Sequence, residues 1–232
     1  MLTLEKLVIE QQDFRLTADW SAKPGARVAI IGPSGFGKST FLLTLAGFLV
    51  PASGRILWQG QDIGTLEPGR RPISILFQDQ NLFPHLTLAQ NLGLGLSPRL
   101  RLTADQNRAV AASLDRVGLA GMADRKPGQV SGGQASRTAL ARALLRAKPI
   151  LLLDEPFSAL GPGLKDEMID LVAEVASETG ALVLMVTHDP QDARRFAPTT
   201  ALVDDGQVLP PKDTAALFAA PPESLRRYLG SA

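Results

Sequence analysis

The sequence predicts an α/β fold in which a mixed sheet is flanked by helices, with an antiparallel β subdomain and an inserted helical subdomain. Short β-rich runs alternate with longer helical patterns along the 232 residues. Four runs are almost continuously apolar, which is typical of strands buried on both faces of a parallel sheet. They lie at 27–31, 73–77, 150–153 and 181–187.

A long segment without strand patterns interrupts this alternation. Residues 84–147 contain no convincing strand and several helical patterns. We therefore expect one domain over residues 1–232. In it, 1–83 and 148–232 would form the core with the β subdomain, and 84–147 would form the helical subdomain.

The remaining elements follow from periodicity. The runs at 4–10, 14–19 and 54–59 alternate between apolar and polar residues, as strands of an antiparallel sheet with one exposed face do. A further strand is expected at 199–204, and helices at 39–48, 131–148 and 161–180. In the last helix one apolar stripe is formed by Leu164, Met168, Leu171, Val172 and Val175, and Gly180 suits the C-cap. In the helix at 131–148 one side carries Ala139, Leu140, Ala143, Leu144 and Ala147.

The composition excludes several classes of function. Lys and Arg number 24 and Asp and Glu 23, without the positive surplus that sequence-independent nucleic-acid binding needs. The chain has no cysteine, which rules out disulfides, thiolate metal sites and a Cys nucleophile. The longest apolar run, 41–50, has about half the length that crosses a bilayer. The N-terminus does not read as a signal peptide, so we expect a cytosolic chain that reaches a membrane only through a partner.

Residues 32–40, GPSGFGKST, match the phosphate-loop pattern G-x-x-x-x-G-K-[ST], between a buried strand and a helix. Such a loop turns successive N–H groups toward phosphate oxygens at a helix N-terminus. Lys38 would neutralise the β- and γ-phosphates, and the Ser39 hydroxyl would bind Mg²⁺. The alternative is a glycine-rich turn without a ligand. We expect a P-loop NTPase core in which ATP is held by Gly32, Pro33, Ser34, Gly35, Phe36, Gly37, Lys38, Ser39 and Thr40.

Polar residues follow three of the apolar strands. Asp154 and Glu155 come after the strand at 150–153, at the edge where α/β sheets bind ligands. Asp154 would hold Mg²⁺, and Glu155 would polarise the attacking water. Gln78 would join the Mg²⁺ sphere or position water, and His188 would contact the γ-phosphate or the water. The alternatives are two solvated acids and a surface or capping histidine.

A second glycine loop, VSGGQ at 130–134, has no lysine. Ser131 suits a helix N-cap, and the N–H groups of Gly132, Gly133 and Gln134 would point off the helix start, where they could bind phosphate. Because this loop is expected to lie far from Lys38, we interpret it as serving a second copy of the chain. Two chains packed head to tail would then enclose two ATP molecules. The alternative is a plain Ser-capped helix start.

In this order, GPSGFGKST, Gln78, VSGGQ, ILLLDEP and His188 resemble the ATP-binding subunits of ABC transporters, over nearly the whole chain. The resemblance implies an ATPase that uses ATP and Mg²⁺ and drives transmembrane permease subunits. A homodimer would sit peripherally on the cytoplasmic face of the bacterial inner membrane, served indirectly by a periplasmic substrate-binding protein, with no nucleic acid involved. The helical subdomain would carry the groove for the permease's coupling helix, and the stretch around Gln78 would border it.

Residues 70–96, with AGFLVPASGRI (46–56) and LLLDEPFSAL (151–160), are similar in particular to the ATP-binding subunits of bacterial thiamine importers. Thiamine import is therefore implied. The alternatives are a soluble, non-transport ABC ATPase and a nucleotide-dependent binding module with low turnover.

Four positions depart from the family pattern. Gly161 stands where an Asp that couples the two ATP sites is usual, Ala135 replaces an Arg, and Val130 replaces a Leu. The aromatic residue that stacks on adenine would be Phe14, unless Phe14 belongs to the core.

Overall fold

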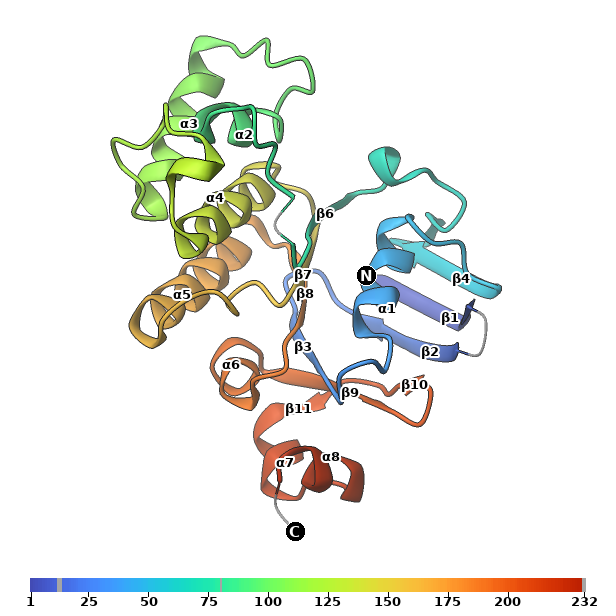
Figure 1. The fold of residues 1–232 in the computed structure, drawn as a ribbon. Helices are drawn as coiled ribbons and strands as arrows, with labels where there is room; N and C mark the ends of the chain where they lie inside the picture. Colours follow the sequence, from blue (N-terminus) through green and yellow to red (C-terminus); the bar gives the residue numbers. More distant parts are fainter. Residues whose placement is uncertain (12–13, 80, 231–232) are drawn as a thin grey trace.

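The computed structural model describes residues 1–232 except 12–13, 80 and 231–232 (Figure 1). Its strands form one eleven-stranded sheet in the order β5-β4-β1-β2-β10-β9-β3-β8-β7-β6, with β11 paired to β9. The strands are β1 (Leu2–Gln11), β2 (Phe14–Ala22), β3 (Arg27–Ile31), β4 (Ser53–Trp58), β5 (Gln61–Asp62), β6 (Ile73–Leu76), β7 (Ile150–Asp154), β8 (Leu182–Val186), β9 (Thr199–Asp204), β10 (Gln207–Val208) and β11 (Lys212–Asp213).

The central strands β9, β3, β8, β7 and β6 pair in parallel. Their apolar residues alternate between two separate hydrophobic clusters. In β3, Val28 and Ile30 belong to one cluster, whereas Ala29 and Ile31 belong to the other. Strands β7 and β8 divide in the same way, which confirms that these continuous apolar runs are buried on both faces.

Strands β1, β2 and β4 pair antiparallel and form the alternating part of the sheet. Leu2, Leu4, Leu7 and Ile9 point into the core, and most residues between them are partly or fully exposed. This burial on one side is what their alternating sequence predicts.

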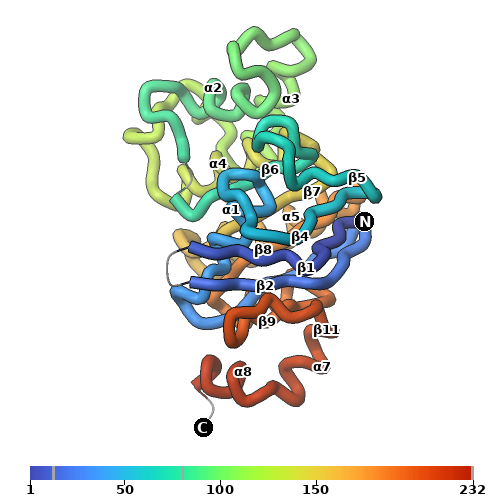
Figure 2. The backbone as a smooth tube through the Cα atoms, turned by 90° about the vertical axis from the view of Figure 1, so that its right-hand side faces the viewer, coloured from blue at the N-terminus to red at the C-terminus, as the bar shows by residue number. Residues whose placement is uncertain are grey.

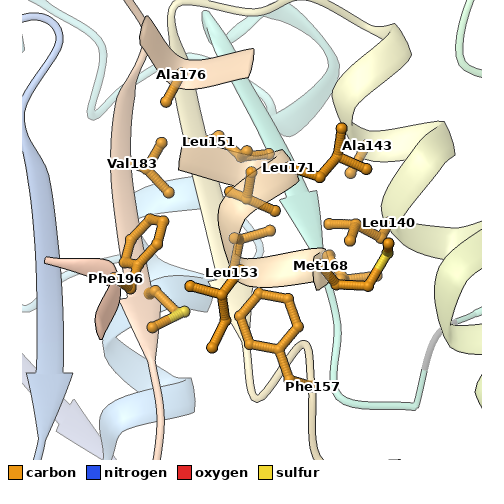
Figure 3. Close-up of a cluster of buried hydrophobic side chains, with 14 of the residues drawn as sticks. Leu140, Ala143, Leu151, Leu153, Phe157, Met168, Leu171, Ala176, Val183 and Phe196 are labelled. Carbon is orange, nitrogen blue, oxygen red and sulfur yellow. The ribbon is translucent and has the colours of Figure 1, made fainter. Parts of the chain in front are cut away.

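The helices cover both faces of the central strands. They are α1 (Lys38–Ala46), α2 (Leu88–Gly93), α3 (Ala104–Arg116), α4 (Gly132–Leu145), α5 (Pro162–Thr179), α6 (Pro190–Phe196), α7 (Thr214–Ala219) and α8 (Glu223–Tyr228), with 3₁₀ turns at Pro68–Arg70 and Pro127–Gln129. Helix α1 shares its core with the central strands and with β1, β2 and β4. Figure 3 shows the opposite face, where α4 and α5 meet β7 and β8 through Leu140, Ala143, Leu151, Leu153, Met168, Leu171 and Val183.

Figures 1 and 2 both place α2 and α3 at the end of the molecule opposite to α7 and α8. No strand lies between residues 84 and 147, all of which the structure describes. Helices α2 and α3 each begin with a capping box, in which Thr87 pairs with Gln90 and Thr103 with Gln106.

Each predicted strand and helix has a counterpart within a few residues, and Gly180 ends α5 with φ 64° as expected. The two-residue strands β5, β10 and β11 were not foreseen. One expectation was wrong: helix α4 ends at Leu145, and Ala147, expected on its apolar side, is exposed with φ 47°. The turn into β7 begins after Leu145. Lys148 and Pro149 follow Ala147, so no apolar side chain extends the stripe beyond it.

Arg71 ties the segment before β6 to the end of α1. Its guanidinium donates to the carbonyls of Thr44 and Leu45 in α1, and to those of Gly64 and Leu66, at 2.7–2.9 Å. The side chain is only 2% exposed. Arg71 therefore satisfies carbonyls at the helix C-terminus that have no intrahelical partner, and fixes the far end of the helix that starts at the phosphate loop.

We expect Arg71→Met to lower the free energy of unfolding by about 3 kcal/mol, because several buried carbonyls lose their donor together. Urea unfolding followed by circular dichroism measures this change. Arg55→Met is the matched control, since Arg55 pairs with Glu5 on the surface and should matter little. Equal losses for the two variants would contradict this role of Arg71.

Candidate nucleotide site

The phosphate-loop residues lie between β3 and α1 and close around Lys38. The Lys38 ammonium donates to the carbonyls of Gly32 and Pro33, each at 2.8 Å. The side chain is 6% exposed, and burial lowers the pKa of Lys38 although Glu155 and Asp154 act to raise it. The loop thus holds a cation in place at the N-terminus of α1.

Gly37 shows why this loop needs glycine immediately before the helix. Its φ is 81°, in the left-handed region, and a Cβ placed there would lie 2.0 Å from Cζ of Phe14. The Phe14 ring therefore lies against the loop. It is half-buried against the core cluster and also lines the cavity. Its contact with adenine stays a prediction.

A cavity of about 910 Å³ opens in front of the loop. Its lining brings together residues from β1, β2, the loop, the start of α1 and the segments just after β6 and β7: Gln11, Phe14, Ser34, Gly35, Gly37, Lys38, Ser39, Thr40, Gln78 and Glu155. Sequence reasoning missed Gln11, which nothing in the residue pattern distinguishes. Gly32, Pro33, Phe36, Asp154 and His188 do not line the cavity, and Phe36 is 43% exposed.

Asp154 contacts Ser39, which lines the cavity. The Ser39 side chain forms a hydrogen bond with the Asp154 carboxylate, which is 6% exposed. Burial raises the pKa of Asp154 and Glu155 adds to this, whereas Ser39 and Lys38 act to lower it. The Oδ1 atom of Asp154 is buried and has no partner among the described residues, an arrangement that suits a bound cation.

Glu155 and His188 form a pair beside the cavity. Nδ1 of His188 lies 3.0 Å from Oε2 of Glu155, and the two side chains are 54% and 18% exposed. Glu155 has φ 47°, an unusual conformation for a residue with a side chain. Its N–H donates to the carbonyl of Val186 at 3.0 Å, so the turn that carries the carboxylate is bonded to the strand before His188.

The second glycine loop is a capped helix start away from the cavity. The Ser131 hydroxyl accepts from the N–H of Gln134, and the Gln134 side chain accepts from the N–H of Ser131. Ser131 and Gly132 are exposed. None of the residues from Ser131 to Gln134 lines the cavity that contains Lys38.

A family model described as ABC transporter matches residues 17–158. The chain belongs to the ABC transporter family. The thiamine import ATP-binding protein ThiQ of Cereibacter sphaeroides is 66% identical, over 99% of this chain and 100% of its own length. The protein of that name from Ruegeria sp. is 52% identical over the full length of both. A solved structure, the dimeric ATP-binding cassette MJ0796 with ADP and Pi, has a TM-score of 0.82 and 30% identity over 92% of this chain and 99% of that one.

Membership of the ABC transporter family makes this chain a nucleotide-binding ATPase, with the P-loop NTPase fold expected from the sequence. Among the described residues, no helix combines the length and the apolar character needed to span a membrane.

In this ABC cassette, a charged cluster holds the segment after β8 that carries His188. Lys165 in the first turn of α5 contacts Asp189 at 2.6 Å and Asp192 at 2.8 Å. The Thr187 hydroxyl donates to Asp192 and accepts from the N–H of Asp189. The cluster thus joins α5 to α6 on either side of His188.

The cluster shifts the pKa of its members. Burial acts to lower the pKa of Lys165, but hydrogen bonds to Asp189 and Asp192 outweigh it and raise this pKa. Burial acts to raise the pKa of Asp189, but bonds from Lys165 and the Gln191 N–H outweigh it and lower this pKa. Both charged forms are therefore favoured in the folded chain.

Gly161 is the N-cap residue of α5, and no side-chain hydrogen bond caps this helix start among the described residues. Its φ of −71° and ψ of 160° suit any residue, and no described atom lies within 4 Å of a Cβ placed there. An Asp at this position would therefore fit the backbone and could accept a hydrogen bond from the helix start.

Lys165→Met is expected to lower the free energy of unfolding by about 1–2 kcal/mol, because Asp189 and Asp192 lose their cation. The loss should be constant from about pH 5 to pH 9, above the ordinary pKa of Asp and below that of Lys. It should shrink as the pH falls through the lowered pKa of Asp189, and as it rises through the raised pKa of Lys165. Urea unfolding across this pH range measures it.

Arg195→Met is the control for this prediction, since Arg195 joins the same two helices through Asp166 and Asp170. Those carboxylates are 54% and 64% exposed, so the loss should be smaller and should fade with added salt. An equal loss in both variants would contradict the importance of the Lys165 cluster.

Gly161→Asp should raise the free energy of unfolding by a few tenths of a kcal/mol, about the difference between Asp and Gly at an N-cap. Gly161→Ala fits the same space but cannot accept the hydrogen bond, and should lower it. Thermal unfolding of both variants measures the two signs. The affinity for ATP should not change, since Gly161 does not line the cavity.

Proposed function

We propose that this chain is the ATP-hydrolysing subunit of a bacterial importer whose cargo is thiamine. The observation that carries the hydrolytic role is the position of the Glu155 carboxylate. Glu155 lines the cavity that contains Lys38, and its carboxylate pairs with His188. The cargo rests on the two thiamine import relatives, 66% and 52% identical over nearly the whole of both chains. Similarity of this extent favours a transport subunit over a soluble ABC ATPase or a low-turnover binding module.

ATP would bind with its phosphates in the loop from Gly32 to Thr40. The N–H groups there and the N-terminus of α1 attract phosphate oxygens, and Lys38 would exchange its bonds to the Gly32 and Pro33 carbonyls for bonds to phosphate. Phe14 is the aromatic side chain in the described cavity lining, which makes it the candidate for contact with the base.

The cavity and the adjacent Asp154 have the donor set that Mg²⁺ prefers. Ser39 and Gln78 line the cavity and offer hydroxyl and amide oxygens. Asp154, which is hydrogen-bonded to Ser39, offers a carboxylate whose Oδ1 atom lacks a partner among the described residues. When bound, Mg²⁺ would neutralise charge on the phosphates. The residues present therefore fit this ion.

Hydrolysis would be performed by Glu155 with His188 and Gln78. The Glu155 carboxylate would accept a proton from the attacking water, and the left-handed turn and the bond to Val186 hold it at the strand end. Donation from Nδ1 of His188 to Glu155 would leave Nε2 as an acceptor and keep the ring in one orientation. Gln78 would position the water from the neighbouring strand.

The second loop would complete the site in a homodimer. Within one chain, the residues from Ser131 to Gln134 do not line the cavity, and their helix start is exposed. A partner packed head to tail would bring this helix N-terminus to the phosphates. The similarity to a dimeric ABC cassette supports this arrangement.

A second groove, of about 710 Å³, would receive the permease. It lies between the core and the helical subdomain and is lined by Phe48, Ile75, Phe77, Asn81, Leu82, Phe83, Leu94, Gly95, Pro98, Arg142, Ala143 and Arg146. Phe48 and Phe83 are 52% and 46% exposed. Large apolar side chains exposed together in a groove are typical of a surface that a partner covers. The chain would then lie on the cytoplasmic face of the inner membrane, with a periplasmic binding protein delivering thiamine to the permease.

Glu155→Gln should keep ATP binding and lower the rate of hydrolysis about 10²–10⁴-fold, because the variant loses its general base. It should also accumulate an ATP-bound dimer. Phosphate release and size-exclusion chromatography with ATP measure both effects. Thiamine uptake by cells that carry only the variant should fall with hydrolysis, while uptake of an unrelated solute should not.

Glu167→Gln on α5 is the matched control, since Glu167 is exposed and lies outside the cavity. It should hydrolyse ATP at the normal rate. Normal hydrolysis by Glu155→Gln would contradict the role of Glu155, whereas lost hydrolysis with normal thiamine uptake would contradict the cargo.

A further inference from the structure

The C-terminal helices are docked onto the core beside the segment that carries His188. In α7, Leu217 and Phe218 are buried, and the Arg194 guanidinium of α6 lies 4.3 Å from the centre of the Phe218 ring. In α8, Leu225 is fully buried. Figure 1 shows both helices below α6 and β11, so this tail is part of the packed structure.

Tyr228, the last residue of α8, reaches the candidate active site. It is the only tyrosine in the chain. Its hydroxyl donates to the backbone carbonyl of His188 at 2.5 Å. Burial raises the pKa of Tyr228 and the negative charge of Glu155 raises it further, so the phenol stays protonated and remains a donor.

The link from β8 to α6 consists of Thr187, His188 and Asp189, and each is held by a different group. The Thr187 hydroxyl bonds with Asp192 and with the N–H of Asp189. Asp189 accepts from Lys165. The His188 carbonyl accepts from the Tyr228 hydroxyl, which is the side-chain contact described for the His188 backbone.

Glu155 contacts the imidazole itself, whereas Tyr228 restrains the peptide that carries it. His188 is 54% exposed, so packing alone does not fix its ring. A peptide free to rotate would carry Nδ1 away from the Glu155 oxygen that lies 3.0 Å from it. The hydroxyl of Tyr228 opposes that rotation.

We propose that Tyr228 is a positioning residue for hydrolysis, which keeps the His188 imidazole on Glu155 by binding the His188 carbonyl. This rests on the roles proposed above for His188 and Glu155. The helix that ends at Tyr228 thereby links the C-terminal tail to turnover.

Tyr228→Phe tests the proposal, because it removes the hydroxyl and keeps the ring that packs on the core. In the full-length chain, kcat should fall about three- to tenfold, the range that corresponds to the loss of one hydrogen bond. The KM for ATP should not change, since Tyr228 does not line the cavity. Arg227→Gln is the control on the same helix, as it breaks only an exposed pair with Glu223, and its kcat should stay normal.

Nuclear magnetic resonance of ¹⁵N-histidine-labelled protein observes the ring directly. The chain has two histidines, His85 and His188, and His188→Ala assigns their signals. In Tyr228→Phe the imidazole signals of His188 should move and those of His85 should stay. This readout does not depend on a general change in stability.

The outcomes separate the two proposals. Unmoved His188 signals would overturn the positioning role and leave the hydrolytic role of His188 intact. Moved signals with an unchanged kcat would contradict the role of His188 in hydrolysis, and the positioning role with it. A rise in KM for ATP equal to the fall in kcat would also overturn the inference, because it would indicate a general disturbance of the site.

Discussion

Both faces of β3, β7 and β8 are covered by apolar side chains, and this constraint decides where polar chemistry can occur. A buried polar side chain within these strands would need a partner that the neighbouring layers do not offer. Polar groups are therefore confined to the strand ends. Parallel pairing aligns those ends: Ile30 and Asp154 both lie opposite Val186, and Leu153 lies opposite Leu76. The phosphate loop, Asp154, Glu155, His188 and Gln78 consequently follow one edge of the sheet.

The same edge concentrates groups that are costly to hold. Lys38 and Asp154 are buried in the same small region. Burial lowers the pKa of Lys38 and raises the pKa of Asp154, which in both cases favours the neutral form. Glu155 adopts a left-handed backbone conformation, which costs on the order of 1 kcal/mol or more for a residue with a side chain. Such costs persist only where surrounding structure fixes the backbone. For Glu155 the surrounding structure includes the bond from its N–H to the Val186 carbonyl of β8.

The sequence was informative where a local pattern has one structural meaning. Continuous apolar runs, alternating runs and a glycine loop before a helix led to the strands, the phosphate loop and the residues at the strand ends. The capped start of α4 was also predicted, from Ser131, although its place in a dimer stays a prediction. Strands β5, β10 and β11 were not predictable, because two residues have no periodicity and their pairing depends on neighbours distant in the chain.

Contacts between distant segments were beyond the sequence for the same reason. Nothing near Phe14 indicates that its ring lies against Gly37, and nothing near Lys165 indicates that Asp189 is its partner. Tyr228 lies 40 residues beyond His188, at the end of α8, the third helix after it. These groups share a feature that only the fold reveals: each restrains a residue at the sheet edge from a different element.

Gly161 shows how such restraints change the meaning of a departure from a family pattern. A missing acid at a helix start normally removes a cap and loosens the first turn. In this chain Pro162 occupies the first helical position, where its fixed φ favours the helix. Lys165, within the same first turn, is anchored to Asp189 and Asp192. Pro162 and Lys165 thus fix the start of α5, and the N-cap side chain contributes nothing. Glycine at 161 therefore costs the fold little.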